Sequence, residues 1–130
     1  MRFVVLHHTD WPGKPDHYDL LIQTKKGHGD DRFLRAFATV TDDFPSPALD
    51  ETSDQCLLHA QEDHRIRYLD YEGLVGGERG QVSRADEGKC EHIEPPSGSR
   101  LKCHLQGEHL RGTFEIRKRD EAWIIEKIQN

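Results

Sequence analysis

The stretch from Leu101 to Ile128, LKCHLQGEHLRGTFEIRKRDEAWIIEKI, decides the fold class of this chain. It contains three short strand-like runs, which are Leu101 to Gln106, Leu110 to Lys118 and Ala122 to Ile128. Gly107 and the pair Arg119-Asp120 separate these runs with residues that favour turns. Short strands joined by turns at this spacing are typical of an all-β barrel or sandwich. The last run also allows a short helix.

The rest of the chain continues the same pattern. Further strand-like runs are Phe3 to His7, His17 to Gln23, Phe33 to Val40, Gln55 to Glu62, Gln81 to Ala85 and Lys89 to Ile93. Turn residues, above all glycine and proline, separate many of these runs. A surface loop is expected over Thr41 to Asp54, and the segment Asp63 to Asp70 allows one helical turn. We therefore expect one domain over residues 1–130. Its fold should be all-β with minor helical turns, a small closed or partly open antiparallel β-barrel.

Composition limits the kinds of partner that this chain can have. It has 130 residues, a formal net charge of -6 and an isoelectric point near 5.8. An acidic protein is a poor match for broad electrostatic binding to duplex DNA or RNA, which usually needs basic patches. An enzyme that touches only the end of a nucleic acid is not excluded, because a metal and a few cations can offset phosphate charge locally.

The cysteines and the N-terminal run indicate the compartment. Cys56, Cys90 and Cys103 are odd in number and lack C-x-x-C spacing, so we expect reduced thiols in the cytoplasm and no structural zinc site. The apolar run at residues 1–6 is too short for a signal peptide or a membrane span, and no membrane association is expected.

The first candidate site combines His7-His8 with His17-Tyr18-Asp19. Side chains alternate faces along a strand, so His17 and Asp19 point the same way. Two imidazoles and a carboxylate on one face suit manganese, zinc or iron. The alternative is that the two N-terminal histidines lie on the surface and Asp19 pairs with a lysine or arginine.

The second candidate site is Glu62-Asp63-His64 followed by Tyr68. A histidine and a phenol four residues apart can meet on one side of a helical turn. Both can hydrogen-bond a phosphate oxygen, and histidine can also protonate a leaving group. The alternative is a solvated charged turn with Tyr68 covering the core.

Two other features are weaker. The glycine-rich segment from Gly73 to Gly80 lacks the spacing of a phosphate loop, so it predicts a tight bend between strands. The cationic residues from Arg100 onward are expected to lie on exposed strand faces. Arg111 is the exception, because it lies beside Gly107 and Gly112 and could reach inward toward a substrate.

Several segments in order carry a family resemblance. They are Phe3-Val4-Val5-Leu6-His7-His8, His17-Tyr18-Asp19-Leu20, Leu34-Arg35-Ala36-Phe37-Ala38, Glu62-Asp63-His64 with Tyr68 and Glu72-Gly73, Leu105-Gln106-Gly107 with Leu110-Arg111-Gly112, and Trp123-Ile124-Ile125-Glu126-Lys127. Together they resemble the 3'-phosphoesterase domain of bacterial DNA ligase D and its stand-alone relatives. Each motif is short, but their order extends over nearly the whole chain.

The resemblance implies a small β-barrel that holds Mn²⁺, or another divalent transition metal such as Zn²⁺ or Co²⁺. Its metal ligands correspond to His8, His17 and Asp19. Its phosphate-contacting pair corresponds to His64 and Tyr68, with Glu62 as a supporting acid. The implied activity is DNA repair by trimming 3' ends: removal of a 3'-phosphate, or of a 3' ribonucleoside followed by its phosphate. DNA ends are expected in preference to RNA, a separate ligase or polymerase of end joining is a candidate partner, and the protein is expected to be a monomer.

The chain also departs from the family pattern. The loop between the two metal histidines is three residues longer, so His7 competes with His8 as the first ligand. Cationic positions of the family fall on Leu21, on Cys56 and near Val40 or Thr41. Leucine does not replace a bidentate guanidinium, so metal binding is predicted more firmly than phosphatase activity.

Two other functions stay open. A non-catalytic barrel that binds a metal or a nucleic-acid end would account for the missing cations. A cupin-like metal enzyme on another substrate would add a histidine ligand from a late strand, such as His92 or His104.

Overall fold

The computed structural model describes residues 1–39 and 55–128, and their regular secondary structure is nearly all β. The elements are β1 (Arg2–Thr9), β2 (His17–Gln23), β3 (Leu34–Thr39), β4 (Gln55–His64), the 3₁₀ helix η2 (Ile66–Leu69), β5 (Gly73–Leu74), β6 (Gln81–His92), β7 (Arg100–Gln106), β8 (Arg111–Arg119) and β9 (Ala122–Lys127). The predicted all-β class with a minor helical turn is confirmed. The loop predicted over residues 41–54 lies outside the described residues.

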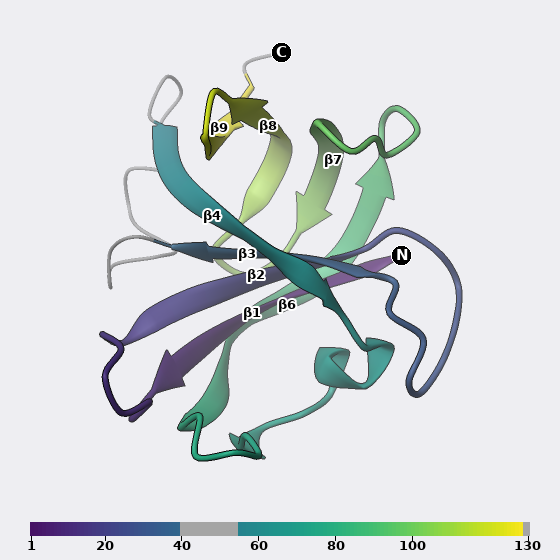
Figure 1. Ribbon diagram of the computed structural model, residues 1–130. Coiled ribbons are helices and arrows are strands. Elements are labelled where there is room, and N and C mark those ends of the chain that lie inside the picture. The colour runs from purple at the N-terminus through teal and green to yellow at the C-terminus, as the bar shows by residue number, and fades with distance from the viewer. Residues whose placement is uncertain (40–54, 129–130) are drawn as a thin grey trace.

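Eight strands close into an antiparallel barrel (Figure 1). The order around the barrel is β1-β2-β3-β4-β9-β8-β7-β6, and β6 pairs with β1 to complete the ring, while the short β5 pairs with the start of β6. Closure pairs the backbone groups of strands that would otherwise form open edges. Of the predicted closed or partly open forms, the closed one is observed.

Two local predictions are corrected. The runs Gln81 to Ala85 and Lys89 to Ile93 form one strand, β6, and Gly88 lies inside it. A Cβ atom on Gly88 would lie 2.0 Å from the Gln106 carbonyl oxygen, so glycine here permits close approach of β7 and does not end the strand. The C-terminal run is the strand β9, paired with β4 and β8, and the helical alternative is wrong.

Apolar side chains form two cores, one on each face of the N-terminal strands. The barrel interior is filled by Phe3, Val5, Leu20, Ile22, Phe37, Leu58, Cys90, Leu101, Cys103, Leu105, Leu110, Phe114, Ile116, Trp123 and Ile125. The second core lies on the outer face and contains Val4, Leu6, Leu21, Leu34, Ala36, Leu69 and Val82. Because η2 and the segment that follows it cover this outer face (Figure 1), β1 and β2 are buried on both sides.

Asp86 fixes the turn between β7 and β8. Its buried carboxylate accepts hydrogen bonds from the backbone N–H groups of Glu87, Glu108, His109 and Leu110 at 2.8–3.1 Å. Three of these donors belong to the turn, so one side chain satisfies most of its inward-facing amides.

Candidate metal centre and its pocket

The structure brings His8, His17 and Asp19 together on the outer face of β1 and β2. His8 lies directly opposite His17 in the antiparallel register, and Asp19 lies opposite Leu6. All three side chains are buried, and one possible ligand atom from each lies within 4.8 Å of the others. The predicted alternation of faces along His17-Tyr18-Asp19 is therefore observed.

The same register distinguishes His8 from His7. His7 points to the opposite face of β1, where its ring stacks on Tyr18 with centroids 4.3 Å apart. His8 contacts Asp19 instead, with Nδ1 3.2 Å from Oδ2. Of the two candidates for first ligand, His8 has the required position.

Backbone carbonyl groups orient both imidazoles of this cluster. His8 Nε2 donates to the Arg79 carbonyl, and His17 Nδ1 donates to the Pro15 carbonyl at 3.1 Å. These bonds leave His8 Nδ1 and His17 Nε2 as lone-pair nitrogens that face the Asp19 carboxylate. Metal-binding histidines typically donate their second N–H to a backbone carbonyl or carboxylate in this way.

Two buried atoms of the cluster have no hydrogen-bond partner among the described residues, His17 Nε2 and Asp19 Oδ1. They lie 3.3 Å apart, but the geometry between them is not that of a hydrogen bond. A buried polar atom without a partner is costly. A cation between these atoms would satisfy both, and two imidazoles with a carboxylate suit a divalent transition metal.

The electrostatics of the metal-free cluster favour its charged forms. The contact with Asp19 raises the pKa of His17 against the opposing effect of burial. Burial by itself would raise the pKa of Asp19, but the contacts with His17 and His8 outweigh it, and the pKa lies below its usual range. The carboxylate is therefore ionised and ready to bind a cation.

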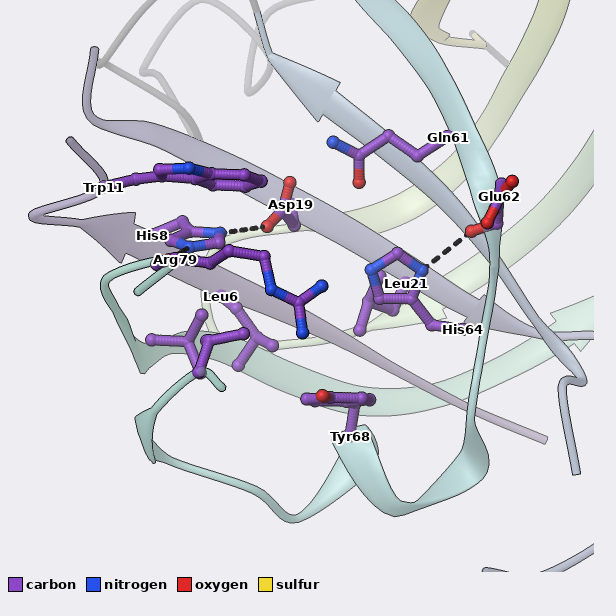
Figure 2. Close-up of a pocket in the computed structure, with 12 residues that line it drawn as sticks. Leu6, His8, Trp11, Asp19, Leu21, Gln61, Glu62, His64, Tyr68 and Arg79 are labelled. Carbon is purple, nitrogen blue, oxygen red and sulfur yellow. Dashed lines mark hydrogen bonds and ion pairs between the residues drawn. The ribbon is translucent and has the colours of Figure 1, made fainter. Parts of the chain in front are cut away.

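A pocket of about 260 Å³ opens beside this cluster. Its lining includes His8, Asp19, Glu62, His64, Tyr68 and Arg79, so the first and second predicted sites meet in one cavity (Figure 2). The ring centroids of His64 and Tyr68 lie 5.8 Å apart in an edge-on arrangement. His64 Nδ1 donates to the backbone carbonyl of Glu62 at 2.7 Å, which leaves Nε2 to exchange a proton with a ligand.

Two further residues of the pocket were not predicted. Trp11 stacks over His8 with ring centroids 5.0 Å apart, and Arg79 reaches between His8 and His64 (Figure 2). Arg79 belongs to the glycine-rich segment for which the sequence predicted only a bend. The only sequence feature that could have indicated a role for Arg79 was its position between glycines just before a strand.

The cationic side of the site differs from the prediction. Arg111 does not line this pocket; it is exposed at the start of β8, opposite Gln106 and away from the end of β1 that carries His8. Instead Arg32, Arg65 and Arg79 line an adjoining hollow that shares His64 and Tyr68 with the pocket.

The positions where the family pattern expects cations have other roles here. Leu21 lines the apolar floor of the pocket, and Cys56 packs against the barrel interior. Val40 and Thr41 lie outside the described residues.

Neither late-strand histidine joins His8, His17 and Asp19. His104 lies beside Thr113 on the paired strands β7 and β8. His92 groups with Cys90 and Cys103, a possible ligand set that the sequence did not predict because no short motif unites it. A C-x-H spacing within one strand was its only signal.

The part of the chain described here contains no helix long and apolar enough to cross a membrane. Comparison with protein-family models gave no match, and comparison with curated proteins gave none.

Proposed function

We propose that this protein is a metal-dependent phosphoesterase that trims nucleic-acid 3' ends, with Mn²⁺ as the preferred ion. The observation that carries the proposal is the pocket that His8 and Asp19 share with His64, Tyr68 and Arg79, with His17 grouped beside His8 and Asp19. It joins an oriented set of nitrogen and oxygen ligands to groups that can bind a phosphate and transfer a proton.

His8 Nδ1, His17 Nε2 and Asp19 would hold the ion. A divalent cation bound there supplies a Lewis acid that polarises a phosphate oxygen and lowers the pKa of a bound water. The N–H bonds to Arg79 and Pro15 hold the two rings in their ligating orientation. Trp11 covers His8 and limits the access of bulk water to this side of the cluster.

The remaining residues of the pocket act on the phosphate. Arg79 presents a guanidinium that can pair with phosphate oxygens. His64, held through Nδ1 by the Glu62 carbonyl, can donate a proton from Nε2 to the leaving oxygen. The Tyr68 ring packs edge-on against His64 and its hydroxyl can hydrogen-bond the phosphate.

The distribution of charge supports an end-binding substrate over a long duplex. Arg32, Arg65 and Arg79 gather around one hollow beside the metal cluster and outnumber its two acids, Glu62 and Asp63, whereas the whole chain carries a net charge of -6. A local group of arginines suits a terminal phosphate and the nucleotide next to it.

The test is a metal-dependent assay on labelled primer-templates that end in a 3'-phosphate or a 3'-ribonucleotide. We expect turnover with Mn²⁺ in the parent protein, and we expect His17→Ala to abolish it and His104→Ala to retain it. His104→Ala is the matched control because it also removes a partly buried histidine. No turnover with Mn²⁺, Co²⁺ or Zn²⁺ would contradict the enzyme. End binding that His17→Ala abolishes, without turnover, would instead support the non-catalytic alternative, for which the apolar Leu21 in the pocket floor is the supporting observation.

A further inference from the structure

A second group of potential metal ligands lies at the other end of the barrel. Cys90 and His92 come from β6, two residues apart, so both point toward the barrel interior, and Cys103 lies directly opposite His92 on β7. The Cys90 N–H bonds the Met1 carbonyl, and His92 bonds Gln23 at the end of β2. This end of β1 and β2 is opposite to the end that carries His8 and His17.

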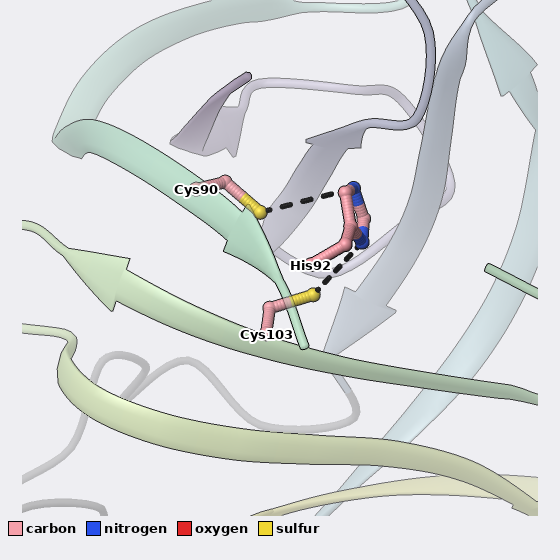
Figure 3. A group of neighbouring side chains, drawn as sticks. All are labelled: Cys90, His92 and Cys103. Atoms are coloured by element: carbon pink, nitrogen blue, oxygen red, sulfur yellow. Dashed lines mark hydrogen bonds between the residues drawn. The ribbon is translucent and has the colours of Figure 1, made fainter. Parts of the chain in front are cut away.

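The three side chains lie side by side, with the Cys90 sulfur 4.0 Å from His92 Nε2 and the Cys103 sulfur beside Nδ1 of the same ring (Figure 3). One ligand atom from each lies within 4.8 Å of the others, and Cys103 Sγ is 3.4 Å from His92 Nδ1. His92 Nε2 donates to the Gln23 carbonyl at 2.7 Å, which leaves the Nδ1 lone pair directed at the sulfur. The imidazole is thus oriented by a backbone carbonyl, as a ligating histidine usually is.

The surroundings of Cys90, His92 and Cys103 also suit a bound ion. Cys90 and Cys103 are 3% and 1% exposed, so an ion held by both sulfurs would be largely shielded from water. Cys90 and His92 also line an open pocket with Met1, Arg2, Lys89 and Gln106, which gives an ion a route in and leaves space for a water as fourth ligand.

We propose that Cys90, His92 and Cys103 form a second metal site for a thiophilic d¹⁰ ion, with Zn²⁺ as the principal candidate. Two sulfurs and one imidazole with an open fourth position match a tetrahedral zinc centre. The His8, His17 and Asp19 cluster offers only nitrogen and oxygen, so the two sites differ in ligand softness and select different metals. A bound ion would join β6 to β7 and, through His92 and Gln23, to the end of β2.

The test uses full-length protein carrying His17→Ala, so that the first cluster contributes no signal. Titration with Co²⁺ should saturate at one equivalent and give the near-ultraviolet charge-transfer absorption of a cobalt-thiolate bond, and Zn²⁺ should displace the cobalt. Adding Cys103→Ser should remove this absorption, whereas adding Cys56→Ser, a thiol in β4 outside the cluster, should leave it unchanged. Absence of the absorption in folded His17→Ala protein would overturn the proposal.

A second measurement applies to the unaltered chain and does not depend on the folding of a cysteine variant. Iodoacetamide alkylation, mapped by mass spectrometry, should slow at Cys90 and Cys103 when Zn²⁺ is added and should be unaffected at Cys56. Equal alkylation rates at Cys90 and Cys103 with and without Zn²⁺ would also overturn the site.

Discussion

The substitution Asp19→Asn separates a metal site from a purely structural ion pair. Asp19 is 4% exposed, and its oxygens lie 3.2 Å from His8 Nδ1 and 3.3 Å from His17 Nε2. Asparagine has the same shape, removes the charge that a cation requires, and adds an N–H₂ group that can donate to one of these nitrogens. We therefore expect the metal-free variant to be as stable as the parent, or more stable by about 1 kcal/mol, the net value of one such hydrogen bond.

The same change should abolish the response to metal. Mn²⁺ at 100 times its dissociation constant stabilises a protein with one site by about 2.7 kcal/mol. For a chain of this length that corresponds to a rise in Tm of roughly 10 °C. We expect this rise in the parent protein and none in Asp19→Asn, by calorimetry or thermal-shift fluorescence.

The pH of the measurement matters because the pKa of His17 is raised in the folded state. A protonated His17 paired with Asp19 adds stability below the unfolded pKa of about 6.5, and this contribution is lost as the pH rises through the folded value. Measurement at pH 8 therefore reduces the contribution of this ion pair to the stability. Asp70→Asn is the matched control, since it makes the same chemical change in an exposed carboxylate paired with Arg2 and should retain the Mn²⁺ response.

The opposite pattern would refute this reasoning. If Asp19 serves only to hold protonated histidines, its replacement leaves buried charge unpaired and should cost roughly 3–5 kcal/mol without metal. Such a loss, together with no effect of Mn²⁺ on the parent protein, would show that the cluster is structural.

Three further substitutions test the pocket and the fold. His64→Gln should lower kcat on a 3'-phosphate substrate by roughly 10²–10⁴-fold, the range for losing a general acid. The Mn²⁺-induced rise in Tm should persist in this variant. An unchanged kcat would show that His64 is not the general acid. Arg79→Ala should raise KM for the same substrate through loss of a phosphate contact worth roughly 1.5–3 kcal/mol. Arg111→Ala is the control and should leave KM unchanged. Equal effects of the two substitutions on KM would contradict the placement of Arg79 in the substrate pocket. Asp86→Ala should destabilise the protein by about 3 kcal/mol, because several turn amides lose their acceptor, and a fall in Tm of less than a few degrees would show that water replaces it.

Strand alternation was enough to predict part of the metal cluster. His17 and Asp19 are two residues apart on one strand, so their common direction follows from local geometry. The choice between His7 and His8 needed the register of β1 against β2, which a single sequence does not contain. A shift of one residue would exchange the two histidines between the faces of the sheet.

Contacts between distant segments account for what was not predicted. Cys103 meets His92 only because β7 pairs with β6 in one particular register. Arg79 enters the pocket because the segment before β6 folds back over the outer face of β1, and no local pattern encodes that path. The break predicted between the runs Gln81 to Ala85 and Lys89 to Ile93 was wrong because the role of Gly88 depends on Gln106, a residue on a different strand.

The most direct test of the central claim is a crystal structure of the protein soaked in Mn²⁺, with data collected at the manganese absorption edge. We predict an anomalous peak enclosed by His8 Nδ1, His17 Nε2 and the Asp19 carboxylate, facing His64 and Arg79 across the pocket. A fully soaked crystal with no peak at this position, or with manganese bound only elsewhere, would contradict the account.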